Sequence, residues 1–145
     1  MFLGEYSHSI DAKNRLIVPA KYRDELGENF ILTKGFDGCL YIYPQKEWEI
    51  FEEKLNSLPV GKSDTRKMVR FFMSSATQAE FDKQGRILIP VTHKKHADLD
   101  REVVFAGVGK KIEIWSKERW DETATIDCED MDTVAENLSD LGIDF

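Results

Sequence analysis

Short apolar segments, separated by Gly, Pro and polar turns, run along this chain and predict short β-strands joined by small helices. The expected strands are residues 1–10, 15–18, 30–33, 40–43, a segment that ends at 81, and 86–89, 103–106 and 112–115. Helical spacing is found over 20–26, about 44–58, about 63–74, a short segment after 90, and from about 117. Short strands joined in this way favour a small barrel of mixed strands over a parallel sheet.

One phrase occurs twice. Residues 10–19 read IDAKNRLIVP, and residues 81–90 read FDKQGRILIP, at an offset of 71 residues. Each copy has an apolar residue, Asp, three linker residues, Arg, three aliphatic residues and Pro. Such self-similarity indicates a duplicated supersecondary unit.

The match continues beyond the phrase at an offset of 72, which predicts one inserted residue near Leu26 and Ala97. Units of about 40 residues bury too little surface to be stable alone, so we expect the two to pack together. The aligned pairs are Gly35 with Gly107, Leu40 with Ile112, Ile42 with Ile114, and Trp48 with Trp120. We expect the two tryptophans to begin equivalent helices.

The charges divide the chain into a nearly neutral body, residues 1–120, and an acidic tail, residues 121–145. The net charge is -7, but residues 121–145 hold nine acids and no Lys or Arg, and the other 120 residues hold 20 basic and 18 acidic side chains. A body of +2 is compatible with nucleic-acid binding without arguing strongly for it. No apolar run is long enough to span a membrane and no secretory signal is visible, so we expect a cytoplasmic protein. Cys39 and Cys128 have the character of reduced thiols, and Cys39 that of a small buried hydrophobe.

The repeated turn is the strongest candidate for chemistry. An Asp that opens a loop can accept backbone N–H groups two or three residues on and can pair with the Arg four positions later. Asn14 and Gly85 suit a left-handed backbone. A purely structural brace and a functional loop both remain open; the functional interpretation rests on positive charge beside the turns, from Lys13, Lys83 and Lys21.

Other motifs are weak. His93 and His96 have a His-x-x-His spacing without further ligands nearby, so we expect no metal site and no cofactor. No nucleophile, phosphate-loop or dinucleotide motif occurs, so the sequence predicts no enzyme and no small-molecule substrate. The acidic tail, which can form a short helix over about 131–141, is either a solubilising end or a regulatory one. A basic set is either a solvated helix face or an edge that contacts phosphate or another subunit: Lys62, Arg66, Lys67 and Arg70.

Several features together strongly resemble the MraZ family of bacterial transcriptional regulators. They are the duplicated Asp-x-x-x-Arg phrase, the start MFLGEY, the run IVPAKYR at residues 17–23, and IWS at residues 114–116. The resemblance covers about residues 1–120 and leaves the tail outside. It implies an α+β fold: two tandem SpoVT/AbrB-type swapped-hairpin units that form one pseudo-twofold small β-barrel with flanking helices.

We therefore expect a first unit with its helix at 1–58, a connecting helix at 59–75, a second unit at 76–124 and an acidic tail at 125–145. The resemblance further implies a ring-shaped homo-oligomer that binds double-stranded DNA. Its sites would be short direct repeats in the promoter of the cell-division and cell-wall gene cluster, which places the protein at the nucleoid. The alternative is a ring-forming scaffold that binds protein partners through the acidic tail.

The family's DNA-contact elements map onto the two Asp-x-x-x-Arg turns. Arg15 and Arg86 are expected to face DNA, with Asp11 and Asp82 bracing the loops. Asn14 stands where the family often has Gly. The residues expected to assist the two arginines are Lys13, Asn14 and Lys83.

Overall fold

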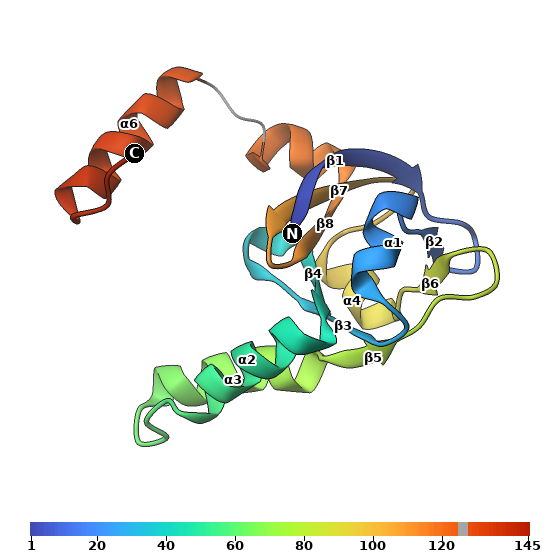
Figure 1. Ribbon diagram of the computed structural model, residues 1–145, viewed down its shortest axis with the longest axis horizontal. Helices are drawn as coiled ribbons and strands as arrows, with labels where there is room; N and C mark the ends of the chain where they lie inside the picture. The colour runs from blue at the N-terminus through green and yellow to red at the C-terminus, as the bar shows by residue number, and fades with distance from the viewer. Residues whose placement is uncertain (125–127) are drawn as a thin grey trace.

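The computed structural model describes residues 1–124 and 128–145 (Figure 1). The strands are β1 (Phe2–Ser9), β2 (Arg15–Ile17), β3 (Phe30–Lys34), β4 (Leu40–Pro44), β5 (Thr77–Ala79), β6 (Arg86–Leu88), β7 (Glu102–Gly109) and β8 (Ile112–Ser116). The α-helices are α1 (Ala20–Leu26), α2 (Gln45–Asn56), α3 (Ser63–Ser75), α4 (Val91–His96), α5 (Lys117–Arg119) and α6 (Cys128–Asp140). A 3-10 turn η1 (Phe36–Gly38) and a π-helical turn η2 (Trp120–Ala124) complete the order. The start of the expected tail, residues 125–127, lies outside the described residues, as does the side chain of Cys128.

The strand order repeats the internal duplication of the sequence. The larger sheet is antiparallel with the order β1-β7-β8-β4-β3-β5, and a separate ribbon pairs β2 with β6. The equivalent strands β4 and β8 form the central pair. The first strand of each unit pairs with a strand of the other unit, β1 with β7 and β5 with β3. The two units therefore share one sheet, and neither has a complete sheet of its own.

The larger sheet does not close into a barrel in the described residues, so the predicted barrel is wrong in this respect. Closure would require the outer strands β1 and β5 to pair. Each of these strands instead leads into an Asp turn and then into the β2–β6 ribbon, which lies beside the open side of the sheet (Figure 1). The ribbon joins the sheet core through its inward side chains Leu16, Val18, Ile87 and Ile89.

The register of the second hairpin differs from the sequence alignment. Leu32 faces Ile42 across the first hairpin, and Phe105 faces Ile114 across the second. Because Ile42 and Ile114 are equivalent at an offset of 72, Leu32 corresponds to Phe105 at an offset of 73. The predicted alignment of Gly35 with Gly107 is therefore wrong by one residue. Relative to the first repeat, the second has two residues inserted before β7, and its hairpin turn is one residue shorter than the turn between β3 and β4. Successive side chains of a strand point to opposite faces of the sheet, so the register is set by which residue points into the core, here Leu32 in β3 and Phe105 in β7.

Two apolar clusters cover the two faces of the sheet. The inner one joins the sheet to the ribbon, α1 and α4; the outer one is covered by α2, α3 and η2. Equivalent aromatic pairs hold the equivalent helices: Tyr43 contacts Trp48 with ring centroids 5.7 Å apart, and Trp115 contacts Trp120 at 5.8 Å. The two tryptophans occupy equivalent positions, each the fourth residue after its strand, but Trp48 lies in the α-helix α2, whereas Trp120 begins η2 directly after the three-residue α5. The prediction that they begin equivalent helices is therefore right in position and wrong in the length and type of the second helix.

The outer cluster also accounts for residues singled out by the sequence. Phe72 of α3 is buried against Phe51 of α2, so it serves the core of its own chain. Cys39 is buried, as predicted, and its Sγ–H donates to the carbonyl of Phe36 at 3.2 Å. No described helix is both long and apolar enough to cross a bilayer.

Candidate nucleic-acid interface

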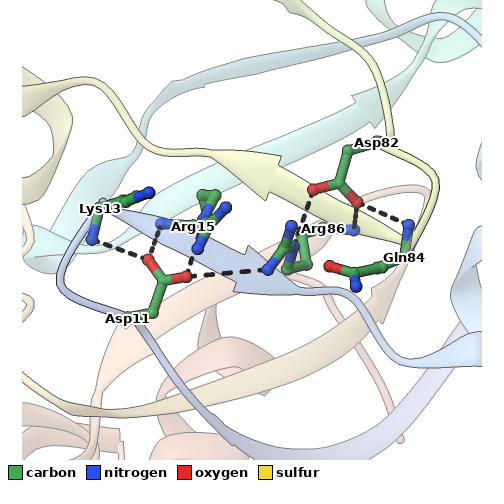
Figure 2. A network of polar contacts seen from close by, with 6 residues as sticks. All are labelled: Asp11, Lys13, Arg15, Asp82, Gln84 and Arg86. Atoms are coloured by element: carbon green, nitrogen blue, oxygen red, sulfur yellow. Dashed lines mark hydrogen bonds and ion pairs between the residues drawn. The ribbon is translucent and has the colours of Figure 1, made fainter.

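The first Asp turn is held by three hydrogen bonds to one carboxylate (Figure 2). Oδ1 of Asp11 accepts the backbone N–H groups of Lys13 and Arg15, both at 2.9 Å, and Oδ2 accepts Nε–H of Arg15 at 2.8 Å. The N–H of Arg15 lies four residues after Asp11, whereas the sequence predicted donors only two or three residues after the Asp. The backbone closes the same turn, because the amide of Asp11 donates to the carbonyl of Arg15.

The second turn repeats this geometry. Oδ1 of Asp82 accepts the backbone N–H groups of Gln84 and Arg86, both at 2.9 Å, and Oδ2 accepts Nε–H of Arg86 at 2.7 Å. The terminal nitrogen Nη1 of Arg86 also lies 4.0 Å from Oδ2 of Asp11, which links the two turns (Figure 2).

The hydrogen bonds favour the ionised form of both carboxyl groups. The backbone N–H of Arg15 lowers the pKa of Asp11 most, and the Arg15 side chain and the Lys13 N–H lower it further. Arg86 and Gln84 lower the pKa of Asp82 in the same way. Both turns are therefore negatively charged on the inside at neutral pH, and each carboxylate fixes the direction of its arginine.

Each turn is also tied to the strand that follows the other. The amide of Val18 donates to the carbonyl of Gly85 at 3.1 Å, and the amide of Ile89 donates to the carbonyl of Asn14 at 2.8 Å. Asn14 has φ of 61° and Gly85 has φ of 76°, so both occupy the left-handed region that the sequence predicts. This crossed pairing makes the two turns one rigid unit with approximate twofold symmetry.

The ribbon shows two kinds of side chain on its two faces. Leu16 and Ile87 point inward and are buried. The outer face combines two half-buried arginines with two exposed aliphatic residues: Arg15, Arg86, Ile17 (41% exposed) and Leu88 (64% exposed). The arginines were predicted as site residues, whereas Ile17 and Leu88 were not. The alternation of inward and outward side chains along each strand could have identified these two aliphatic residues.

Two further basic residues reach the turns from helices of the opposite unit. Nζ of Lys94 in α4 donates to Oδ1 of Asn14 at 2.9 Å. The guanidinium of Arg23 in α1 lies where a side chain at Gly85 would have to be placed. Arg23 and Lys94 were not predicted as site residues, although both are basic and lie 71 residues apart, at the offset of the repeat. The predicted residues Lys13 and Lys83 are exposed at the tips of the turns.

A family model described as "MraZ protein, putative antitoxin-like" matches residues 1–71 and again residues 72–140. The chain belongs to the MraZ family. Proteins called transcriptional regulator MraZ are similar over nearly the whole length. One from Clostridium tetani is 54% identical over 99% of this chain and all of its own, and one from Pediococcus pentosaceus is 51% identical with the same coverage. A third, from Lachnoclostridium phytofermentans, is 52% identical over all of both chains.

In the second MraZ repeat, the two histidines of the His-x-x-His spacing form hydrogen bonds with backbone carbonyl groups. Nε2–H of the buried His93 donates to the carbonyl of Ser75 at 2.7 Å, and Nε2–H of His96 donates to that of Gly35 at 3.0 Å. Neither imidazole belongs to a group of three or more candidate metal ligands among the described residues. His93 joins α4 to the end of α3, and His96 joins it to Gly35, which follows β3 in the first MraZ repeat.

The buried His93 predicts a loss of stability in mild acid. Burial lowers the pKa of His93, while its hydrogen bond to Ser75 opposes this shift. The unfolded chain therefore takes up a proton at His93 first as the pH falls through about 6.5, and the free energy of unfolding decreases. We expect the wild-type protein to be less stable at pH 5.5 than at pH 7.5 in urea titrations.

The matched variant for this test is His93→Gln, which keeps an N–H donor for Ser75 but cannot titrate. Its free energy of unfolding should change less between the two pH values than that of the wild type. Burial also lowers the pKa of His8, so His8→Gln serves as the comparison for a second histidine. Equal slopes for the wild type and His93→Gln would contradict the assignment.

Proposed function

We propose that this MraZ-family protein is a sequence-specific DNA-binding transcriptional regulator and has no catalytic activity. It works in the cytoplasm at the nucleoid, as a ring-shaped homo-oligomer on short direct repeats in the promoter of the cell-division and cell-wall gene cluster. The observation that carries the proposal is the outer face of the β2–β6 ribbon, where two arginines are held in fixed directions by their own Asp turns. The names of the similar proteins agree with it.

A two-stranded ribbon has the width that the major groove of DNA admits. In each turn Asp engages Nε of the arginine. The two terminal Nη atoms of an arginine can donate together to O6 and N7 of guanine, the commonest specific contact between a side chain and a base. Nη1 of Arg86 also lies 4.0 Å from Oδ2 of Asp11, which is longer than a hydrogen bond, so Arg86 would turn this nitrogen from Asp11 toward the base. Lys13, Lys83 and the amide N–H groups of Asn14 would assist at the turns, and Ile17 and Leu88 can contact thymine methyl groups.

The modest charge of the protein favours binding through several subunits. One protomer offers few positive groups at its turns, so one ribbon on one site should bind weakly. If a ring presents the same ribbon from several protomers, each further contact on the same duplex becomes intramolecular, and its effective concentration multiplies the affinity. Direct repeats in the DNA then match the repeated ribbons in the protein.

This mechanism predicts a steep dependence of affinity on the number of site copies. Duplexes with one, two and four copies of the promoter repeat should bind with affinities that rise by roughly 10²- to 10⁴-fold in total. The logarithm of the affinity should fall by about 0.9 per log unit of salt for each phosphate neutralised. The measurement is a fluorescence anisotropy titration of each duplex at two salt concentrations.

A scrambled duplex of the same length and base composition is the control, because it retains all phosphate contacts and removes the repeats. Equal affinity for one, two and four copies would exclude the multivalent mechanism. Equal affinity for scrambled and repeated duplexes would exclude sequence-specific recognition and favour the scaffold alternative.

A further inference from the structure

The helical hairpin of α2 and α3 carries an apolar groove that the rest of the chain leaves open. Its volume is about 260 Å³, and it is lined by residues of η1, α2, the turn after α2, and α3: Phe36, Phe51, Lys54, Leu55, Leu58, Met68 and Phe72. Phe36, Leu58 and Met68 are exposed although they are large and apolar. Among the described residues that line the groove, Lys54 is the only charged one. An apolar groove of this kind on a hairpin fits the apolar side of a helix.

The C-terminal helix α6 has an apolar stripe with the spacing that such a groove binds. Met131, Val134 and Leu138 follow one another at intervals of three and four residues, which places them on one side of the helix, and Leu141 follows three residues later in the turn after it. Met131, Val134 and Leu141 are exposed, and no described residue of α6 lines the α2–α3 groove of its own chain. The groove of its own chain therefore does not cover the stripe in the described residues.

The two surfaces also complement each other in charge. Asp130, Asp132, Glu136 and Asp140 lie on α6, and residues 121–145 contain no Lys or Arg. The groove presents Lys54 from α2, whereas the basic residues Lys67 and Arg70 lie on the side of α3 that faces away from Met68 and Phe72. A helix with an apolar stripe and only acidic charges can bury its stripe in this groove, because the one charged residue of the lining, Lys54, is of opposite sign.

We propose that α6 of one protomer docks in the α2–α3 groove of a second copy of the chain. The helices α2 and α3, which line the groove, pack on β3 and β4, whereas α5, from which the chain continues toward α6, packs on β7 in the other half of the sheet (Figure 1). Each protomer therefore offers one helix and one groove at different places. A head-to-tail contact of this kind generates a closed ring when the rotation between protomers closes.

This inference rests on the self-association within the proposed function and assigns a partner to the acidic helix. The ribbon with its two arginines is not part of the contact, so DNA recognition and assembly are tested separately.

The test compares the mass of full-length variants by size-exclusion chromatography with light scattering at micromolar concentration. Leu138→Asp places a charge in the stripe of α6, and Met68→Asp places one at the rim of the groove. Each should raise the concentration at which the oligomer half-dissociates by at least about tenfold, because burying an unpaired charge is unfavourable. Asn137→Asp adds the same charge to α6 beside the stripe and should leave the mass unchanged. Circular dichroism checks that each variant is folded.

Mixing the two variants decides whether the contact is between chains. Leu138→Asp retains an intact groove and Met68→Asp retains an intact helix, so an equimolar mixture should form a two-chain species that neither variant forms alone. An oligomer of unchanged mass in both variants would overturn the inference. Dissociation without recovery in the mixture would overturn it as well and would place α6 in the groove of its own chain. A monomeric wild type would refute the ring itself, independently of the DNA titration.

Discussion

Replacing both Arg15 and Arg86 with Ala should abolish the preference of this protein for its promoter repeats over scrambled DNA. Each arginine that donates to a guanine edge contributes about 1–3 kcal/mol per engaged turn, and removing it relaxes specificity at that base. Both side chains lie on the outer face of the ribbon, while Leu16 and Ile87 hold its inner face. The fold should therefore survive, and the loss should be seen in anisotropy titrations of repeat and scrambled duplexes.

Two control variants distinguish recognition of a base from a general effect of positive charge. Lys46→Ala removes an exposed positive charge from α2, away from the ribbon, and should leave the specificity ratio unchanged. Arg15→Lys keeps the charge and loses the paired donors, so it should bind the repeats weakly if the arginine reads a base. Unchanged repeat binding by the double variant would refute the ribbon as the DNA interface. Unfolding of Arg15→Ala alone would show that the turn is a structural brace.

Replacing Phe105 with Ala should destabilise the protein by about 3–5 kcal/mol, the usual cost of truncating a fully buried Phe. Phe105 is 0% exposed in β7, where it faces Tyr6 of the first repeat and Ile114 of β8. Total stabilities of small proteins are about 5–15 kcal/mol, so a loss of this size is a large share. Urea titrations should show a lower midpoint with an unchanged slope.

The control is Val108→Ala in the same strand, where the side chain is 47% exposed. It removes less apolar surface and creates no cavity, so the loss of stability should be small. Because β1 pairs with β7 across the two repeats, the Phe105 variant should lose both repeats in one transition. Two separate transitions, or equal effects of the two substitutions, would contradict a single shared core.

The sequence by itself determined the local geometry of the turns. An Asp followed by Arg four residues later, with Asn or Gly in between at the position before Arg, contains the donors, the acceptor and the left-handed residue that the turn requires. Asn14 and Gly85 therefore adopt positive φ, and Asp11 and Asp82 bind their own arginines. The same holds for the helix with Trp48 in its first turn, since its spacing and its aromatic partners lie within a few residues.

Only the tertiary structure decided how the two repeats combine. The pairing of β1 with β7 and of β2 with β6 joins residues that are far apart in the sequence, and no local pattern records which strands meet. The sheet remains open because its outer strands turn into the ribbon, and the inward position of Phe105 shifts the register from the sequence alignment. The exposure of Ile17 and Leu88 follows from the same long-range pairing: alternation says that one face of a strand differs from the other, and packing decides which of them is covered.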